Sequence, residues 1–251
     1  MEVHKHPHHV THKKKWGEYL LEFFMLFLAV FLGFVAENVR EHSIERQHEK
    51  EYIRGLVQNL KSDTAQLTLT ITKNIKKRNA WDSLMSLSDV KLALPENARR
   101  FYDYFIKGSF TSIFNPSDAA LLQLKNTGNL RLLTNKNIAD SILAYDAYNK
   151  VIVSHNQEFT ERGNEMWNAA YPIMQGKIMS DTSYVDYSNR RVITQNVPPL
   201  ILNNRDLQIF FGELARTLLF TDVNRHLIIR QKGNAERLIT LLQKQYHLEN
   251  E

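Results

Sequence analysis

The sequence predicts an all-α protein in which an N-terminal transmembrane helix continues into an elongated antiparallel helical bundle. Three observations predict this fold class. An apolar run occupies residues 16–36. Beyond it, three long stretches repeat apolar residues at helical spacing. Glycine and proline are scarce, with 9 Gly and 6 Pro in 251 residues. So few breakers favour long helices over a many-turned β fold.

These patterns divide the chain into three regions. A basic, His-rich cytoplasmic tail is expected at 1–15, a transmembrane helix at 16–36, and a helical extracytoplasmic domain at 37–251. An apolar content of 43% is enough for a core. Because the chain has no cysteine, disulfides, thiolate metal sites and cysteine nucleophiles are excluded.

The apolar run has the features of an uncleaved signal anchor. From Tyr19 to Ala36 only Glu22 interrupts it, and about 20 residues are what a helix needs to cross a bilayer. Trp16 and Tyr19 stand where an interfacial aromatic belt is expected. Cleavage after Ala36 would place Phe34 where signal peptidase needs a small residue, so a removable signal peptide is disfavoured.

The charges beside the run predict its direction. Lys13, Lys14 and Lys15 abut its N-terminal end, which assigns that end to the cytoplasm by the positive-inside rule. Arg40 and Arg46 on the other side reduce the contrast. The expected location is a bacterial inner membrane crossed once, with the C-terminal domain in the periplasm.

Proline, glycine and capping residues predict where the helices of the domain begin and end. The first helix is expected to leave the membrane and run to about Leu87. The others are a short helix from Pro95 to just before Gly108, one begun by Asn115-Pro116 and ended at Gly128, one capped by Thr134 or Asn135 and running to about Met174, and one capped by Asn204 and running to about Tyr246. A small β-hairpin is favoured near 183–194, on a two-residue Ser188-Asn189 turn.

Apolar stripes indicate which side of each long helix faces the core. The predicted stripes are Ile53, Leu56, Val57, Leu60, Leu67, Ile71, Ile75 and Leu84 in the first helix; Ile138, Ile142, Tyr145, Ile152, Phe159, Met166, Ala170 and Ile173 in the second; and Leu207, Phe210, Phe211, Leu214, Leu218, Ile229, Leu238 and Leu242 in the last.

Three segments resemble a family of uncharacterised bacterial single-span membrane proteins. They are GEYLLEFFMLFLAVFLGFVAEN (17–38), EKEYIRGLVQNLKSDT (49–64) and LKNTGNLRLLTNKNIADSILAY (124–145). Members of that family open with a short His- and Lys-rich tail, followed by one anchor and a helical extracytoplasmic domain. The resemblance therefore implies the same topology for this chain, and it implies no activity.

The anchor holds the first candidate functional surface. Glu22, Ala29 and Ala36 are seven residues apart, and Gly33 falls on the same side. Small side chains let two membrane helices approach closely, and an acid can hydrogen-bond across the contact. The alternative is that Glu22, near the interface, simply extends to the headgroups. Phe23, Phe27, Phe31 and Phe34 cover another face, suited to lipid or a second partner.

Polar residues within the apolar stripes form a second candidate. His155 and Arg162 interrupt one predicted helix, Asp222 and Arg225 interrupt the last, and Asp63 lies near the stripe of the first. Since each lies near the middle of its helix, we expect His155 to approach Asp222 or Arg225. Such residues form a structural polar layer, occupy simple surface positions, or line a pocket for an anion or small ligand.

The tail and the basic run offer weaker candidates. His4, His6, His8, His9 and His12 could bind Zn, Ni or Cu, although a disordered polar tail fits as well. No metal or other cofactor is predicted. Lys73, Lys76, Lys77 and Arg78 come nearest to a nucleic-acid footprint, but they are interpreted as a solvated helix end, so no nucleic acid partner is expected.

Catalytic signatures are missing from the sequence. It contains no H-E-x-x-H, G-x-S-x-G, Walker or G-x-G-x-x-G motif, so we expect no enzyme. The first functional hypothesis is a membrane-anchored interaction or scaffold protein, a subunit or accessory of a membrane complex. Its partners would be the bilayer and either another membrane protein or a second copy. The alternative is a periplasmic ligand-binding sensory lobe that acts through a partner.

Overall fold

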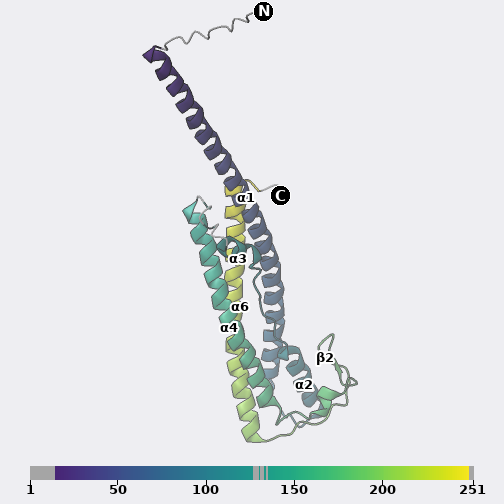
Figure 1. The fold of residues 1–251 in the computed structure, drawn as a ribbon. Coiled ribbons are helices and arrows are strands. Elements are labelled where there is room, and N and C mark those ends of the chain that lie inside the picture. Colours follow the sequence, from purple (N-terminus) through teal and green to yellow (C-terminus); the bar gives the residue numbers. More distant parts are fainter. Residues whose placement is uncertain (1–14, 127–129, 131–132, 134, 249–251) are drawn as a thin grey trace, which may run out of the picture. The chain divides into compact units, whose positions relative to one another are not determined.

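The computed structural model describes residues 15–126, 130, 133 and 135–248. In the described residues its regular structure is helical apart from one two-stranded sheet (Figure 1). The elements are α1 (Trp16–Met85), α2 (Pro95–Ser109), α3 (Ala119–Asn126), α4 (Lys136–Ala170), α5 (Lys177–Ser180), β1 (Val185–Asp186), β2 (Arg191–Val192) and α6 (Asn204–Tyr246). The predicted fold class, an apolar N-terminal helix leading into a helical bundle, is confirmed.

Helix α1 is 70 residues long and belongs to two compact units. The first unit ends at Glu51 and the second runs from Tyr52 to Glu251. No proline and only three glycines, at 17, 33 and 55, occur in α1, which is why it continues without a break past the predicted span.

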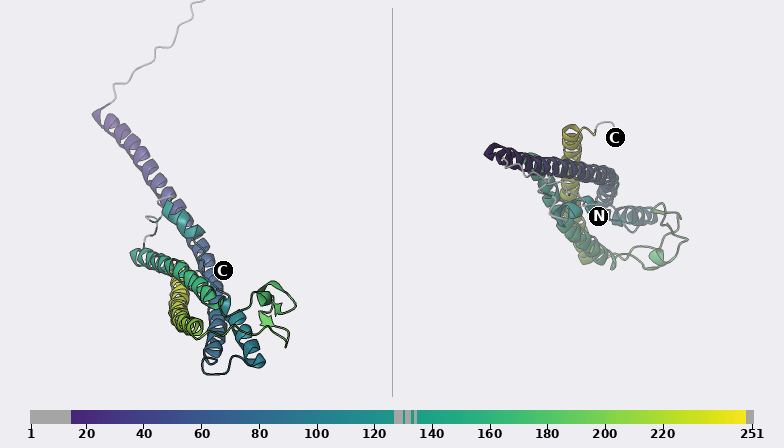
Figure 2. Two further views of the ribbon diagram at one scale, coloured as in Figure 1. Left: turned by 90° about the horizontal axis from the view of Figure 1, so that it is seen from below. Right: turned by 45° about the horizontal axis from the view of Figure 1, so that its top comes forward.

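Three long helical stretches make up most of the second unit. They are α1 from Tyr52 onward, α4 and α6, which lie side by side (Figures 1 and 2). One core cluster joins Ile53–Leu60, Ile138–Tyr145 and Ala235–Leu242. A second joins Trp81–Leu84, Met166–Ala170 and Phe210–Leu218. Helices α1 and α4 therefore run in the same direction, and α6 runs antiparallel to both.

The buried positions of these helices alternate three and four residues apart. This is the heptad spacing of a coiled coil, in which a seam of side chains stays turned toward the neighbouring helices. The buried seams are Leu60, Asp63, Leu67, Thr70, Asn74, Lys77, Trp81 and Leu84 in α1; Ile138, Ile142, Tyr145, Asn149, Ile152, Asn156 and Phe159 in α4; and Phe210, Leu214, Thr217, Thr221, Asn224, Ile228, Gln231, Ala235, Leu238 and Leu242 in α6.

The seam corrects two predicted core positions. Ile75 is 41% exposed and Ile229 is 48% exposed, whereas the polar Asn74 and the apolar Ile228 beside them are buried. Both predictions were wrong because they followed the apolar residue type rather than the spacing. Because a one-residue shift turns a helix by about 100°, the side chain next to a seam position faces solvent.

A non-helical segment, residues 110–118, returns the chain along the bundle and allows α1 and α4 to be parallel. Phe114 in its middle is fully buried and packs with Leu67, Ile152 and Ile228. The prediction that Asn115-Pro116 begins a helix was therefore wrong, since α3 starts at Ala119. Proline holds the residue before it extended, which suits this segment as well as it suits a helix start.

Helix α2 and the hairpin pack at one end of the bundle. Gly108 falls inside α2 rather than after it, and a Cβ there would meet the ring of the buried Trp81 at 2.6 Å. The predicted hairpin forms, with Val185 opposite Val192. Its connection is the four residues 187–190 rather than two, because Asp186 accepts hydrogen bonds from the Asn189 backbone N at 3.0 Å and its Nδ2 at 2.7 Å.

The caps of the two later helices are close to those predicted. Asn135 caps α4 by accepting from the Asn137 N at 3.0 Å. Asn203, rather than Asn204, caps α6 by accepting from the Arg205 N at 2.9 Å. Helix α4 ends at Ala170, one turn before the predicted Met174, and a turn at Tyr171–Met174 follows it.

Candidate functional site

Helix α1 contains one segment long and apolar enough to span a membrane, by length and composition. Its 18-residue window has a mean hydropathy of 2.3, and no part of that window is buried within the protein. The rings of Phe23, Phe27 and Phe31 stack along one side, with centroids 6.3 and 6.2 Å apart. At 100° per residue, Ala29, Gly33 and Ala36 lie on the opposite side. No neighbouring atom lies within 4 Å of a Cβ built at Gly33.

Polar side chains interrupt the seams in the middle of the bundle, between the two large apolar clusters. The buried polar residues of this section are Asp63, Thr70, Asn74 and Lys77 from α1, Asn149 and Asn156 from α4, and Thr217, Thr221, Asn224 and Gln231 from α6. A buried polar group costs free energy unless it is hydrogen-bonded. The partners of these residues therefore show what the section does.

Asp63 ties the returning segment to α1 and α4. Its Oδ1 accepts from the Ser117 backbone N at 2.7 Å, and its Oδ2 accepts from the Tyr145 hydroxyl at 2.8 Å. Burial raises the pKa of Asp63, and the two hydrogen bonds oppose that rise. Burial and the nearby carboxylate also raise the pKa of Tyr145, so the tyrosine remains a donor.

Two further side chains bind the same returning segment. The Nδ2 of Asn156 donates to the Phe114 carbonyl at 2.8 Å, and the Nζ of Lys77 donates to the Thr111 Oγ1 at 3.2 Å. A non-helical backbone has no ladder of its own, so its buried polar groups need partners from side chains. Part of the polar section thus exists to hold residues 110–118 in the bundle.

Asn149 and Gln231 connect α4 to α6. The Nε2 of Gln231 donates to the Asn149 Oδ1 at 2.5 Å and to the Tyr145 carbonyl at 3.1 Å. Asn234 donates in turn to the Gln231 Oε1 at 2.9 Å. Polar pairs at seam positions fix which turns of two helices face each other, because slipping one helix would leave the groups unpaired.

Lys77 is the one buried cation of the section. Its side chain is 3% exposed, and its Nζ lies 4.8 Å from the Phe159 ring centroid. Burial lowers its pKa to about 8. The prediction that this basic run is a solvated helix end was therefore wrong for Lys77, since position 77 belongs to the heptad seam. Lys73 and Lys76, by contrast, are exposed.

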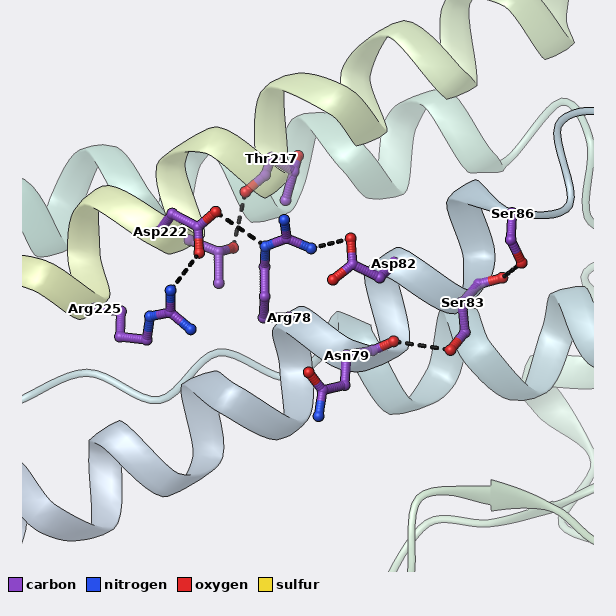
Figure 3. A network of polar contacts seen from close by, with 9 residues as sticks. Arg78, Asn79, Asp82, Ser83, Ser86, Thr217, Asp222 and Arg225 are labelled. Atoms are coloured by element: carbon purple, nitrogen blue, oxygen red, sulfur yellow. Dashed lines mark hydrogen bonds and ion pairs between the residues drawn. The ribbon is translucent and has the colours of Figure 1, made fainter.

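The predicted polar residues of α6 form their own network with α1 (Figure 3). Asp222 pairs with Arg225 at 3.1 Å on the same helix and with the Arg78 Nε at 3.0 Å across the bundle. Arg78 also pairs with Asp82. The side chains of Arg78, Asp222 and Arg225 are 24–31% exposed and that of Asp82 is 53% exposed, so this is a partly solvated ion-pair network on the rim of the polar section.

His155 and Arg162 meet at a different residue. The His155 ring stacks on Phe220 with centroids 6.2 Å apart, and the Arg162 guanidinium lies 5.5 Å from the centroid of the same ring. On α4 itself, Arg162 pairs with Glu165, and the Nδ1 of His155 lies 3.9 Å from Glu158. Within the described residues no hydrogen bond or ion pair joins them to Asp222 or Arg225. The four residues thus form two separate pairs. His155 and Arg162 of α4 meet at Phe220 of α6, whereas Asp222 and Arg225 are both on α6 and pair with each other.

The histidines at 4, 6, 8, 9 and 12 lie outside the described residues. In the part of the chain that the structure describes, no three His, Asp or Glu side chains gather in a way that could hold a metal ion.

No family model, curated protein or solved structure matches this chain. Its function is therefore inferred from its own residues. Sequence reasoning missed Asn74, Lys77, Asn149, Asn156, Asn224 and Gln231 as interior positions. The heptad spacing identifies these positions in the sequence, because it continues through them from one apolar cluster to the next.

Proposed function

We propose that this protein is a single-span, membrane-anchored interaction protein of the bacterial inner membrane. Residues 16–36 would cross the bilayer and pack against a second transmembrane helix, from another copy or from a different protein. The helical domain would lie on the periplasmic side, and the tail before Trp16 would be cytoplasmic.

The observation on which this rests is the exposure of the apolar segment of α1, which no other described part of the chain covers. In water such a surface is strongly unfavourable, at roughly 25 cal/mol per Å² of apolar area. A bilayer removes that cost. The two faces of the helix at residues 16–36 then differ in kind. The stacked phenylalanines suit lipid tails, whereas Ala29, Gly33 and Ala36 leave room for a helix backbone to approach.

Purification in mild detergent tests the packing face. The unaltered protein is expected to elute with a stoichiometric partner or as a defined oligomer. Ala29→Ile with Gly33→Ile should weaken that association, because two branched side chains fill the space a second helix would occupy. Phe27→Ile with Phe31→Ile is the matched control on the other face and should leave it intact. Equal association of all three proteins would contradict the proposal.

Fusions test the direction of the anchor. Alkaline phosphatase joined after Glu251 is expected to be active, because this enzyme matures only outside the cytoplasm. A green fluorescent protein at the same position should stay dark when exported through the general secretion pathway. The reverse pair of results would overturn the assigned topology.

A further inference from the structure

A groove of about 700 Å³ lies between α1, α2 and the turn of the hairpin. Five cationic side chains line it: Lys73, Lys76 and Lys77 from α1, Lys107 from α2 and Arg190 from the hairpin turn. No aspartate or glutamate is among its lining residues. Its volume falls within the range of about 300–1,000 Å³ typical of small-molecule sites.

Most of this positive charge is not neutralised by the described residues. Lys107 pairs with Asp103 at 2.6 Å. In the described part of the chain, Lys73, Lys76, Lys77 and Arg190 have no carboxylate partner. Lys77 is held instead by Thr111 and Phe159. Like charges gathered this closely repel one another, and an anion between them would remove the repulsion.

Asp103 on α2 and Asp186 on β1 are already engaged by other groups of the protein. Asp103 accepts from the Val192 backbone N at 3.0 Å in addition to its bond with Lys107. Asp186 accepts from the backbone and side chain of Asn189 and lies 3.5 Å from Arg191. Both carboxylates thus hold the hairpin in place against α2, and neither lines the groove.

Arg190 reaches the groove through an unusual backbone conformation. Its φ is 54°, in the left-handed region that non-glycine residues rarely adopt. The guanidinium lies 4.2 Å from the centroid of the Phe110 ring, which also lines the groove. A strained residue persists where its surroundings hold it, and such residues cluster at binding sites.

We propose that this groove binds a small phosphate-bearing ligand with two or more negative charges. The unpaired cations from α1 and the hairpin turn would bind the phosphate oxygens, as lysine does as a point charge and arginine as a two-pronged donor. The hydroxyl of Ser188 can add a hydrogen bond, and the rings of Tyr104 and Phe110 offer an apolar wall for an organic group. The phosphate could belong to a free metabolite or to a lipid headgroup.

Calorimetry with pyrophosphate tests the site on the full chain in phosphatidylcholine nanodiscs. We expect saturable binding at one site per chain. Lys73→Gln with Lys76→Gln, and separately Arg190→Gln, should each weaken it by about tenfold or more, since each removes charge-assisted bonds. Lys61→Gln, an exposed lysine on α1 outside the groove, is the matched control and should not change the affinity.

Nanodiscs that also contain phosphatidic acid distinguish the two sources of phosphate. If lipid headgroups reach the groove, phosphatidic acid will compete with pyrophosphate in the unaltered protein. If only free ligands do, the affinity will be the same in both discs. Two results would overturn the proposal. The first is that pyrophosphate does not bind and that the groove substitutions do not change the enrichment of phosphatidic acid around the protein. The other is equal weakening by Lys61→Gln and the groove variants, which would show unspecific attraction by net charge.

Discussion

Asn74 donates from its Nδ2 to the Oδ1 of Asn224 at 2.8 Å, joining α1 to α6 in the middle of the polar section. Both side chains are at most 1% exposed. Neither the Asn74 Oδ1 nor the Asn224 Nδ2 has a hydrogen-bond partner among the described residues. The pair therefore buries four polar groups and forms one hydrogen bond between them. This contributes little to stability and points to a role in aligning α1 with α6.

This pair should show strong coupling in a double-mutant cycle. Asn224→Leu alone leaves the Asn74 amide buried without its partner, which costs about 1–3 kcal/mol. Asn74→Leu with Asn224→Leu replaces both amides and should be close to the unaltered protein or more stable. Chemical denaturation of the full chain in detergent measures the free energy of unfolding of the unaltered protein, the two single variants and the double variant. Simple additivity of the two single effects would contradict a direct interaction.

Asp63 should be essential for holding the returning segment. Asp63→Ala leaves the Ser117 N and the Tyr145 hydroxyl without their acceptor, at about 1–3 kcal/mol for each group. Asp63→Asn keeps an acceptor for the Ser117 N and avoids burying a charge, so its loss should be smaller. Thermal unfolding compares the two variants, and equal losses would mean that the hydrogen bond from the Ser117 N, which asparagine keeps, does not contribute to stability.

The raised pKa of Asp63 gives the same residue a pH signature. The folded state holds the proton more tightly than the unfolded state, so the free energy of unfolding falls as pH rises from the ordinary value of 3.8 through the raised one. Asp63→Asn should lack this part of the pH dependence.

Lys77 should destabilise the fold at neutral pH. Its pKa is lowered from 10.5 to about 8, so the unfolded state binds more protons between those values and stability rises with pH through that window. Lys77→Met keeps the packing of the stem without the buried charge, and should gain up to about 3 kcal/mol at pH 7. The variant should also lose the rise between pH 8 and 10.5. Lys61→Met, on the exposed side of α1, should change neither quantity.

Gly108 should tolerate no side chain. A methyl group there would lie 2.6–2.8 Å from three ring atoms of Trp81, whose side chain is 1% exposed and cannot move aside. Gly108→Ala is expected to cost about 1–3 kcal/mol by overpacking. Gly212→Ala in α6 is the control, because nothing lies within 4 Å of its Cβ position. It should gain up to about 1 kcal/mol from helix propensity. Equal melting temperatures for both variants would contradict this packing.

The sequence predicted the helices better than their interior. Residues such as Ile53, Leu60 and Phe210 are apolar, periodic and buried, so pattern and structure agree. The path of residues 110–118 was not predictable, because Asn115-Pro116 suits an extended segment and a helix start equally well. Without that path there was no reason to place Asp63 and Asn156 against its backbone. The groove depends on Arg190, whose position is set by the hairpin turn and by no local motif.

Photo-crosslinking in intact membranes tests the central claim, that α1 crosses the bilayer with its small-residue face against another helix. A diazirine amino acid of leucine size would replace Ala29 or Ala36 on that face, and Phe27 or Phe31 on the other. We expect protein adducts, to a second copy or another chain, from the first two positions and lipid adducts from the last two. Lipid adducts alone at all four positions would mean that the anchor has no helix partner. Absence of lipid adducts at Phe27 and Phe31 would mean that residues 16–36 do not span the membrane at all.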